Sequence, residues 1–223
     1  ASLPPAVFDQ LRDVFKSPVI EAYGMTEATH QMTSNPMPPM KQKAGFVGKA
    51  AGPEVCIMDK NGNLLKNGLE GEVCIRGDNV TKGYENNDAA NATAFTNGWF
   101  RTGDQGFFDK DGYLKISGRL KEIINRGGEK ISPLEIDNVL MEHEAIEQVV
   151  TFGVKDNLLG EVIGVALVLK INAECSEEEI KKYASEKLAN FKIPKYICFL
   201  DEIPKGATGK LQRIGLAAKL GLE

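Results

Sequence analysis

The sequence contains little of what several classes of protein need. Its 223 residues include only two histidines, four cysteines and one tryptophan, and no two cysteines form a C-x-x-C pair. With no cluster of cysteine and histidine, a zinc site made of protein ligands is not expected. No apolar run approaches the roughly 20 residues of a membrane-spanning helix, and the opening residues ASLPPAVFDQ do not have the form of a signal peptide. The net charge of −4 gives no electrostatic reason to expect a nucleic acid or an anionic membrane as a partner.

The overall composition is that of a soluble globular protein. Apolar residues make up 42% of the chain and charged residues 26%, and the length is enough for one large domain or two ordinary ones. Three of the four cysteines lie in apolar, strand-like runs, so we expect buried, reduced thiols in a cytosol-like compartment. The four are Cys56, Cys74, Cys175 and Cys198.

The first 120 residues predict a helix followed by a β-rich region. Residues 3–15 have apolar side chains at helical spacing, with prolines near the start. The stretch PVIEAYG predicts a short buried strand that runs into a loop, and the proline-rich SNPMPPMKQKAG predicts a connecting loop. EVCIMD, GEVCIRG, GFFD and YLKIS predict short strands, with turns at DKNG and DKDG. We therefore predict a small β-barrel or sandwich over about residues 45–120, interrupted by a helix at DAANATAF.

A different pattern runs from Lys121 to the end of the chain. SPLE predicts a capping box with proline at the first helical position and a helix that continues through His143. SEEE predicts a second capping box, with a helix to about Leu188. EQVVTFGV, EVIGVALVLKI and YICFL predict buried strands, and a short helix follows near the end. The fold class is thus mixed, α/β and α+β, with residues 121–223 forming a complete α+β domain with a three-stranded sheet and residues 1–120 belonging to a separate domain.

The stretch YGMTE, residues 23–27, follows the first predicted strand. A hydroxyl and a carboxylate on a turn loosened by glycine are suited to bind a phosphate and to hold Mg²⁺, which prefers one or two carboxylates together with substrate phosphates. Taken alone, the same residues also fit an ordinary polar turn.

The stretch RTGD, residues 101–104, lies between predicted strands. A carboxylate accepts two hydrogen bonds in a fork, which matches the neighbouring 2′ and 3′ hydroxyls of a ribose. The alternative is an aspartate turn that closes a hairpin.

The stretch GRLKEIINRGGEK, residues 118–130, joins the two patterns. Five charges around an apolar centre, followed by two glycines, predict a pair of strands with a tight turn that a ligand could approach closely. An ordinary hairpin with a solvated, charged face fits the same residues.

The stretch PKGATGKLQR, residues 204–213, has two glycines and a lysine but is not a P-loop. Only two residues separate its glycines, and Leu211 rather than serine or threonine follows Lys210. By itself Lys210 could be a solvated surface lysine.

Together, and in this order, these four stretches resemble the adenylate-forming (AMP-binding) superfamily, which includes acyl-CoA ligases, luciferases and the adenylation domains of peptide synthetases. The resemblance covers essentially the whole chain. EAYGMTEATHQMTSNP and RGGEKISPLEI are most similar to acyl- and aryl-CoA ligases of the 4-coumarate and oxalate type. The resemblance implies an ATP-dependent, AMP-forming acid–CoA ligase: a carboxylate attacks the α-phosphorus of ATP, and CoA then displaces AMP.

The resemblance also implies roles in adenylation. It implies that Thr26 binds the α-phosphate and Glu27 the Mg²⁺. Tyr23 and Gly24 would line the adenine and acyl region, and Asp104 would hold the ribose diol.

Further implied roles concern the region from residue 119 onward. Arg119 would assist at the ribose, and Lys121 would be the hinge about which the small domain rotates between the two half-reactions. Lys210 would reach the carboxylate and phosphate oxygens, where a cation neutralises developing charge in a water-poor cleft. Gly127 and Gly128 would leave room for the pantetheine arm of CoA.

Lys130 and Arg126 are further candidates, for nucleotide phosphate or pyrophosphate. The phosphate loop rich in serine, threonine and glycine lies upstream of YGMTE in this superfamily, and only about twenty residues precede that stretch here. The chain therefore resembles the C-terminal part of a ligase and is expected to be inactive alone. The expected ligands are a carboxylic acid, ATP or AMP, Mg²⁺ and CoA.

Two other functions fit the same stretches. One is an adenylation domain that serves a carrier protein, and the other is a non-catalytic module that binds nucleotide or CoA. The resemblance favours a cytoplasmic location, or a peroxisomal one in a eukaryote, although the chain does not end in an SKL-type signal.

Overall fold

The computed structural model describes residues 3–206, 209 and 211–222. The chain divides between Leu120 and Lys121 into two compact units. Each unit has its own buried clusters of apolar side chains. Helices and strands occur in both units, and the described strands form three sheets. The mixed α and β character predicted from the sequence is therefore confirmed.

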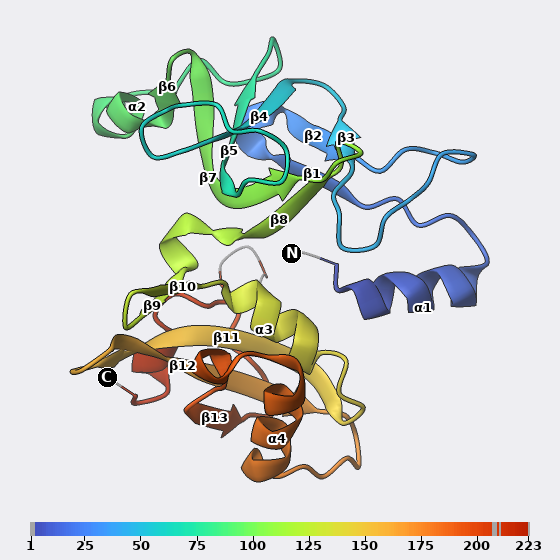
Figure 1. Cartoon of the computed structure of the whole chain (residues 1–223), viewed down its shortest axis with the longest axis vertical. Coiled ribbons are helices and arrows are strands. Elements are labelled where there is room, and N and C mark those ends of the chain that lie inside the picture. The colour runs from blue at the N-terminus through green and yellow to red at the C-terminus, as the bar shows by residue number, and fades with distance from the viewer. Residues whose placement is uncertain (1–2, 207–208, 210, 223) are drawn as a thin grey trace. The chain divides into compact units, whose positions relative to one another are not determined.

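The first unit, up to Leu120, begins with a helix and then consists mainly of strands (Figure 1). Its helices are α1 (Pro5–Phe15) and α2 (Asp88–Ala94). Its strands are β1 (Ala22–Met25), β2 (His30–Ser34), β3 (Lys49–Ala50), β4 (Glu54–Met58), β5 (Gly71–Arg76), β6 (Phe95–Thr96), β7 (Trp99–Phe108) and β8 (Leu114–Arg119). The predicted first helix, the helix at DAANATAF and the four β-rich stretches are thus present, although GFFD is only the end of a ten-residue strand.

The strands of the first unit form two sheets that share a core. One sheet has the order β1-β2-β3, and the other has the order β4-β5-β7-β6 with β8 paired to β7. Met32 of β2 packs with Ile75 of β5 and Phe100 of β7 in one buried cluster. The sheets are also tied by an isolated bridge between Gly48 and Leu114. This pairing does not confirm the more specific prediction of a small barrel.

Two aspartates close the tight turns that the sequence predicted. The Oδ1 atom of Asp59 accepts hydrogen bonds from the backbone N–H groups of Asn61 and Asn63 at 2.8 and 2.9 Å. Asp109 does the same at the next turn, with N–H donors two and four residues later, each at 2.9 Å. Each aspartate thereby holds its turn closed with a side-chain acceptor, and both predicted turns are confirmed.

The second unit, from Lys121, is a sheet with helices on both faces. Its helices are α3 (Pro133–Leu140), α4 (Glu177–Lys187) and α5 (Leu216–Lys219). Its strands are β9 (Ile124–Arg126), β10 (Glu129–Ile131), β11 (Ile146–Asp156), β12 (Gly160–Leu169) and β13 (Tyr196–Phe199). Short 3₁₀ turns span Leu120–Glu122 and Asn190–Lys192.

Strand β12 lies at the centre of this sheet. It is antiparallel to β11 and parallel to β13. These are the three strands that the sequence predicted. The prediction of a three-stranded sheet was nevertheless wrong, because the hairpin β9–β10 joins the same sheet through the pair Gly160 and Arg126. This junction is a single residue pair, which has no recognisable sequence pattern.

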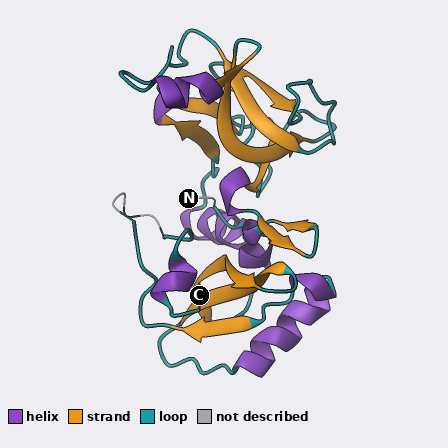
Figure 2. Ribbon diagram, turned by 90° about the vertical axis from the view of Figure 1, so that its left-hand side faces the viewer, coloured by secondary structure: helices purple, strands orange, loops and turns teal. Residues whose placement is uncertain are grey.

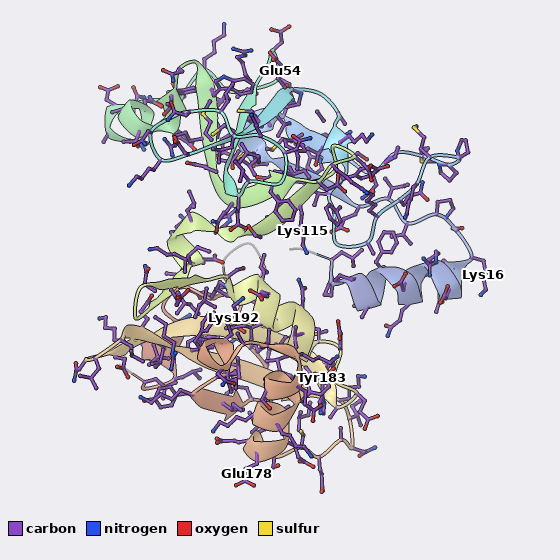
Figure 3. All side chains as sticks on the ribbon, in the orientation of Figure 1. Lys16, Glu54, Lys115, Glu178, Tyr183 and Lys192 are labelled. Carbon is purple, nitrogen blue, oxygen red and sulfur yellow. The ribbon has the colours of Figure 1, made fainter. Side chains whose placement is uncertain are left out.

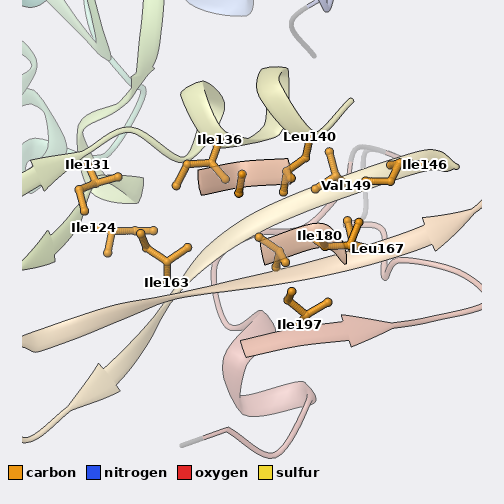
Figure 4. Close-up of a cluster of buried hydrophobic side chains, with 12 residues drawn as sticks. Ile124, Ile131, Ile136, Leu140, Ile146, Val149, Ile163, Leu167, Ile180 and Ile197 are labelled. Carbon is orange, nitrogen blue, oxygen red and sulfur yellow. The ribbon is translucent and has the colours of Figure 1, made fainter. Parts of the chain in front are cut away.

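The two faces of the sheet bury different side chains. Helices α3 and α4 cover one face, where Ile136 and Ile180 pack against Ile163 and Leu167 (Figure 4). Helix α5 covers the other face (Figure 2). There Leu216 packs in a cluster with Phe152. Strand β12 is therefore buried on both faces, which explains its nearly continuous apolar sequence.

The two predicted capping boxes have different outcomes. At the start of α4, Ser176 and Glu179 form the complete reciprocal box, and Glu178 points outward from the helix (Figure 3). At the start of α3, the hydroxyl of Ser132 makes no capping hydrogen bond, and Glu135 instead pairs with Lys192 at 2.6 Å. That box was a wrong prediction, and α3 ends three residues before the predicted His143.

No described helix is a candidate for crossing a membrane. The longest ones, α1 and α4, have 11 residues each, and no helix in the described ranges combines the necessary length with an apolar sequence.

Candidate functional site

The YGMTE stretch forms the end of a strand and the turn that follows it. Tyr23 and Gly24 lie inside β1, in line with the strand predicted over PVIEAYG, but the strand covers only Ala22–Met25 and is not buried as predicted. The turn is Thr26–Ala28, a 3₁₀ segment that leads into β2. Glycine is required at position 24 because a Cβ atom there would lie 1.6 Å from the carbonyl oxygen of His30 on the paired strand. The glycine therefore allows the two strands of this hairpin to approach closely.

The RTGD stretch is a bulge inside strand β7 and not a hairpin turn. Gln105 pairs with Glu72, and Arg101 pairs with Cys74. Three residues of β7 thus lie opposite Val73 alone. Gly103 makes this possible by adopting a φ of +73°, a region that side-chain-bearing residues rarely occupy. Such bulges redirect side chains and are frequent next to active sites.

A buried glutamate holds the bulge in place. Glu72 is 5% exposed and accepts a hydrogen bond from the backbone N–H of Gly103 at 3.0 Å. Its other carboxylate oxygen is paired with the guanidinium of Arg101, whose Nε lies at 2.8 Å. Thr102 closes the bulge by accepting from the N–H of Asp104 at 3.1 Å and donating to the carbonyl of Val73 at 2.7 Å. Each residue of RTGD therefore either forms the bulge or is positioned by it.

The bulge brings the Asp104 carboxylate between Tyr23 and Arg119. The hydroxyl of Tyr23 donates to Oδ2 at 2.5 Å, and the Nε of Arg119 lies 3.0 Å from Oδ1. Burial raises the pKa of Tyr23, and the charge of Asp104 raises it further, so the phenol keeps its proton and remains a donor. Asp104 is 4% exposed, whereas the Arg119 side chain is 53% exposed. Because each carboxylate oxygen has two acceptor positions, Asp104 retains the capacity to accept from two further hydroxyls.

Glu27 lies on the turn after β1 and has an aromatic partner. The hydroxyl of Tyr84 donates to its Oε1 at 2.9 Å. Burial raises the pKa of Tyr84, and the hydrogen bond to Glu27 adds to this shift. Thr26 is exposed on the same turn. The hydroxyl of Thr26 and the carboxylate of Glu27, oriented by Tyr84, therefore belong to consecutive residues of one turn.

A protein can bind Mg²⁺ through a single carboxylate when the phosphates of a substrate supply further ligands to the ion. Among the described residues there is no group of three or more histidine, cysteine, aspartate or glutamate side chains that could hold a metal ion. Glu27 therefore fits an ion delivered with a nucleotide and does not form a metal site of its own.

The remaining candidates belong to the second unit. Lys121 is the first residue of this unit. It is exposed and lies in the 3₁₀ turn Leu120–Glu122. Gly127 and Gly128 form the tight turn between β9 and β10, with φ values of +59° and +96°. A Cβ atom on Gly128 would meet nothing within 4 Å, so that side of the turn is open. Lys130 is exposed on β10, and the predicted strand pair with a tight turn is confirmed.

Lys210 lies outside the described residues. Two other residues of the same segment, 204–213, form an isolated antiparallel bridge: Lys205 and Leu211. Arg213, the last residue of this segment, is largely buried and binds two acids: Glu122 through Nε at 3.0 Å and Asp137 through Nη2 at 2.8 Å. Burial raises the pKa of Asp137, and the charge of Arg213 opposes that shift.

Within the first unit, the structure brings together Tyr23, Asp104 and Arg119 from three different strands. Sequence reasoning missed Glu72 and Tyr84, the partners of the bulge and of Glu27. For Glu72 a signal was available, because an acidic residue inside the apolar run GEVCIR requires a buried partner. For Tyr84 no motif gives a signal.

Models of known families match two parts of the chain. The model for the AMP-binding enzyme matches residues 1–85, and the model for the AMP-binding enzyme C-terminal domain matches residues 135–210. The two matches lie on opposite sides of the division at Leu120 and Lys121. They also occur in the order that the sequence motifs predicted.

Curated relatives match nearly the whole chain. The oxalate–CoA ligase of Saccharomyces cerevisiae is 52% identical over 96% of the chain, and that of Arabidopsis thaliana is 51% identical over 96%. The chain spans 40% and 42% of the length of these relatives. Among solved structures, the o-succinylbenzoate CoA synthetase of Bacillus subtilis, in complex with its acyl-adenylate intermediate, has a TM-score of 0.86 and 34% identity over 96% of the chain and 43% of that protein.

Proposed function

Because this chain belongs to the AMP-binding enzyme family, we propose that it is the C-terminal part of an ATP-dependent, AMP-forming acid–CoA ligase. In the first half-reaction a carboxylate oxygen attacks the α-phosphorus of ATP, and pyrophosphate leaves. In the second, the CoA thiol attacks the acyl carbon, and AMP leaves while the thiol proton is released. Residues up to Leu120 would supply the end of the large domain, and residues from Lys121 the small domain.

The nucleotide contacts rest on the single observation that carries this proposal, the placement of Asp104 between Tyr23 and Arg119. Asp104 accepts hydrogen bonds from the 2′ and 3′ hydroxyls of the ribose. Tyr23 positions this carboxylate through its 2.5 Å hydrogen bond and, with Gly24, lines the adenine and acyl region. Arg119, whose side chain is 53% exposed, assists at the ribose.

The phosphate contacts come from the turn after β1 and from Lys210. Thr26 donates to the α-phosphate, and Glu27 holds Mg²⁺ together with phosphate oxygens, its orientation fixed by Tyr84. When bound, the ion supplies charge neutralisation at the phosphates. Lys210 neutralises the meeting carboxylate and α-phosphate, where a preorganised charge contributes most.

Residues of the second unit would act in the second half-reaction. Lys121 is the hinge, since hinges absorb conformational change over very few residues at the ends of elements. The open side of the turn at Gly127 and Gly128 leaves room for the pantetheine arm of CoA. Lys130 and Arg126 interact with phosphate groups.

For the acid, we propose oxalate. The support is the 52% and 51% identity to two oxalate–CoA ligases over 96% of the chain. The named acid of the matching Bacillus subtilis synthetase, o-succinylbenzoate, also carries a second acid group. The proposed substrate class is therefore a carboxylic acid with a second anionic group.

The full-length protein that contains this chain provides the test. Pyrophosphate release and thioester formation are measured with ATP, Mg²⁺ and CoA, using oxalate, a hydroxycinnamate and a fatty acid in parallel. We expect AMP and oxalyl-CoA from oxalate, and loss of pyrophosphate release in Asp104→Ala. Turnover of only the fatty acid or the hydroxycinnamate would refute the acid, and absence of AMP formation with every acid would refute the ligase.

A further inference from the structure

Two cysteines of the first unit face each other across neighbouring strands. Cys56 of β4 is the direct partner of Cys74 of β5 in the antiparallel register. Both are free thiols. Directly opposed residues of antiparallel strands have Cα atoms about 4.5–5.5 Å apart. That separation lies within the roughly 4.4–6.8 Å found in disulfides, so the backbone spacing is compatible with a bond between the two sulfur atoms.

The two thiols differ in their access to solvent. Cys74 is completely buried, in a cluster with Met58 and Trp99. Cys56 packs at the edge of this cluster and is partly exposed. Nearby, the guanidinium of Arg76 lies 4.3 Å from the centre of the Trp99 ring and covers it. An oxidant dissolved in water therefore reaches Cys56 but not Cys74.

The two thiols also differ in their pKa. The neighbouring Cys74 thiol lowers the pKa of Cys56, against the opposing effect of burial. The neighbouring Cys56 thiol raises the pKa of Cys74, and burial raises it further. Since the thiolate is the form that reacts with oxidants, these directions agree with the difference in exposure and make Cys56 the more reactive of the pair.

We propose that Cys56 and Cys74 are a redox modification site in which Cys56 is oxidised by a peroxide and Cys74 then closes a disulfide between β4 and β5. In the first step the Cys56 sulfur attacks one oxygen of hydrogen peroxide, the O–O bond breaks, and the products are a sulfenic acid and water. In the second step the Cys74 sulfur attacks the Cys56 sulfur, the S–O bond breaks, and the thiol proton leaves with the hydroxyl as a second water. Two thiols are oxidised and one peroxide is reduced.

The site is independent of the proposed ligase activity but close to it in the fold. Strand β5, which carries Cys74, pairs with β7, and Cys74 lies opposite Arg101 at the start of the bulge. A disulfide would join β4 covalently to the strand that supports this bulge. We expect the oxidised protein to unfold at a higher temperature, because the crosslink closes a loop in the unfolded chain.

Peptide mapping tests the proposal without any activity assay. The full-length protein is reduced, exposed to hydrogen peroxide, alkylated with N-ethylmaleimide and digested with trypsin. Cleavage after lysine and arginine places Cys56 in residues 50–60 and Cys74 in residues 67–76, with one cysteine in each peptide. We expect a species containing both peptides, lighter by two hydrogen atoms than their sum and split by dithiothreitol.

Single variants separate the two roles. In Cys74→Ala, the sulfenic acid on Cys56 should persist and be trapped by dimedone, with no linked peptide. In Cys56→Ala, Cys74 should stay reduced because it is buried. Cys198 is the matched internal control, since it is partly exposed on β13 but lies opposite Ala166. Oxidation of Cys198 or Cys175 in the wild type without the 50–60 and 67–76 linkage would overturn the proposal, whatever the variants do.

Discussion

Arg213 is bonded to Glu122, 91 positions earlier in the chain, through an Nε to Oε2 contact of 3.0 Å. The same guanidinium reaches the Asp137 carboxylate at 2.8 Å and the carbonyl of Thr151. Glu122 directly follows Lys121, the proposed hinge. Arg213 is the last residue of the segment 204–213, which carries Lys210. Its largely buried side chain therefore connects the end of that segment to helix α3, to strand β11 and to the residue next to the proposed hinge.

Replacing this cation should destabilise the second unit strongly. In Arg213→Met the buried carboxylate of Asp137 loses its counter-charge, and breaking one side of a buried ion pair costs about 3–5 kcal/mol. Urea denaturation measures this loss. The double variant Asp137→Leu with Arg213→Met is the matched control, and it should recover much of the stability. A loss below about 1 kcal/mol in the single variant would contradict the buried-pair account.

Removing the Tyr23 hydroxyl should weaken nucleotide binding and should also lower the free energy of unfolding. Tyr23→Phe keeps the ring but deletes the donor to Asp104, and a hydrogen bond to a charged group contributes about 1.5–3 kcal/mol. We expect the KM for ATP in the full-length protein to rise about tenfold or more. The matched control is Tyr84→Phe, which loses its bond to Glu27 and should instead raise the Mg²⁺ concentration needed for half-maximal activity. Identical effects of the two variants would argue against separate roles.

Adding one methyl group at Gly24 should disrupt the hairpin that carries Thr26 and Glu27. In Gly24→Ala the new Cβ would lie 1.6 Å from the carbonyl oxygen of His30, so the strands must separate. A misplacement of about 1 Å can cost about 10²-fold in rate, and we expect a loss of that order in pyrophosphate release. Gly77→Ala, where the contacts begin at 3.1 Å, should be far milder. Equal activity of both variants would show that the hairpin tolerates the methyl group.

Glu21 should make the stability of this chain depend on pH near neutrality. It is 8% exposed, its Oε2 has no hydrogen-bond partner among the described residues, and burial raises its pKa to about 7. The unfolded carboxyl has a pKa of about 4.3. Between these values the folded state binds more protons than the unfolded state, so stability falls as pH rises from about 4.5 to about 7.

The neutral isostere removes this dependence. Glu21→Gln should be more stable than the wild type at pH 8 by about 3–4 kcal/mol, and nearly equally stable near pH 4. Denaturant midpoints over this range measure the difference. Equal midpoints at pH 8 would mean that the folded protein accommodates the charged carboxylate without cost.

Lys210 should separate the two half-reactions. In the full-length protein, Lys210→Ala should reduce adenylation about 10²–10³-fold, the usual cost of losing one preorganised charge contact, while transfer from preformed acyl-adenylate to CoA continues. Lys205→Ala is the matched control, because Lys205 pairs with Glu202 at 2.7 Å on the same segment and should change neither step. Parallel loss of both steps and of the melting temperature would make Lys210 a structural residue.

The sequence predicted most local structure because local chemistry determines it. The turns at Asp59 and Asp109 close through hydrogen bonds within four residues, and the capping box at Ser176 needs only Glu179. The errors occurred where distant parts of the chain decide the conformation. At α3, for example, Glu135 pairs with Lys192 and does not complete a capping box. RTGD fits a turn when read alone, but pairing with β5 and β8 extends it into a bulged strand.

The candidate site divides in the same way. Family motifs predicted Tyr23, Asp104 and Arg119 as site residues, and the structure adds how they contact one another. Glu72 and Tyr84 could not be assigned partners from the sequence, because each acts on a residue more than twenty positions away through tertiary packing.

The central position of β12 has a consequence for biosynthesis. As the chain leaves the ribosome, β12 can pair at once with β11, which precedes it. Its other edge pairs with the earlier strand β9 only at Gly160. The rest of that edge must wait for β13, because a parallel neighbour requires a crossover, and here that crossover contains all of α4. Until then an apolar strand edge is exposed, which is the situation in which nascent chains aggregate. Translation speed across α4 therefore sets how long this unit is vulnerable, and slow codons there should lower the yield of folded protein.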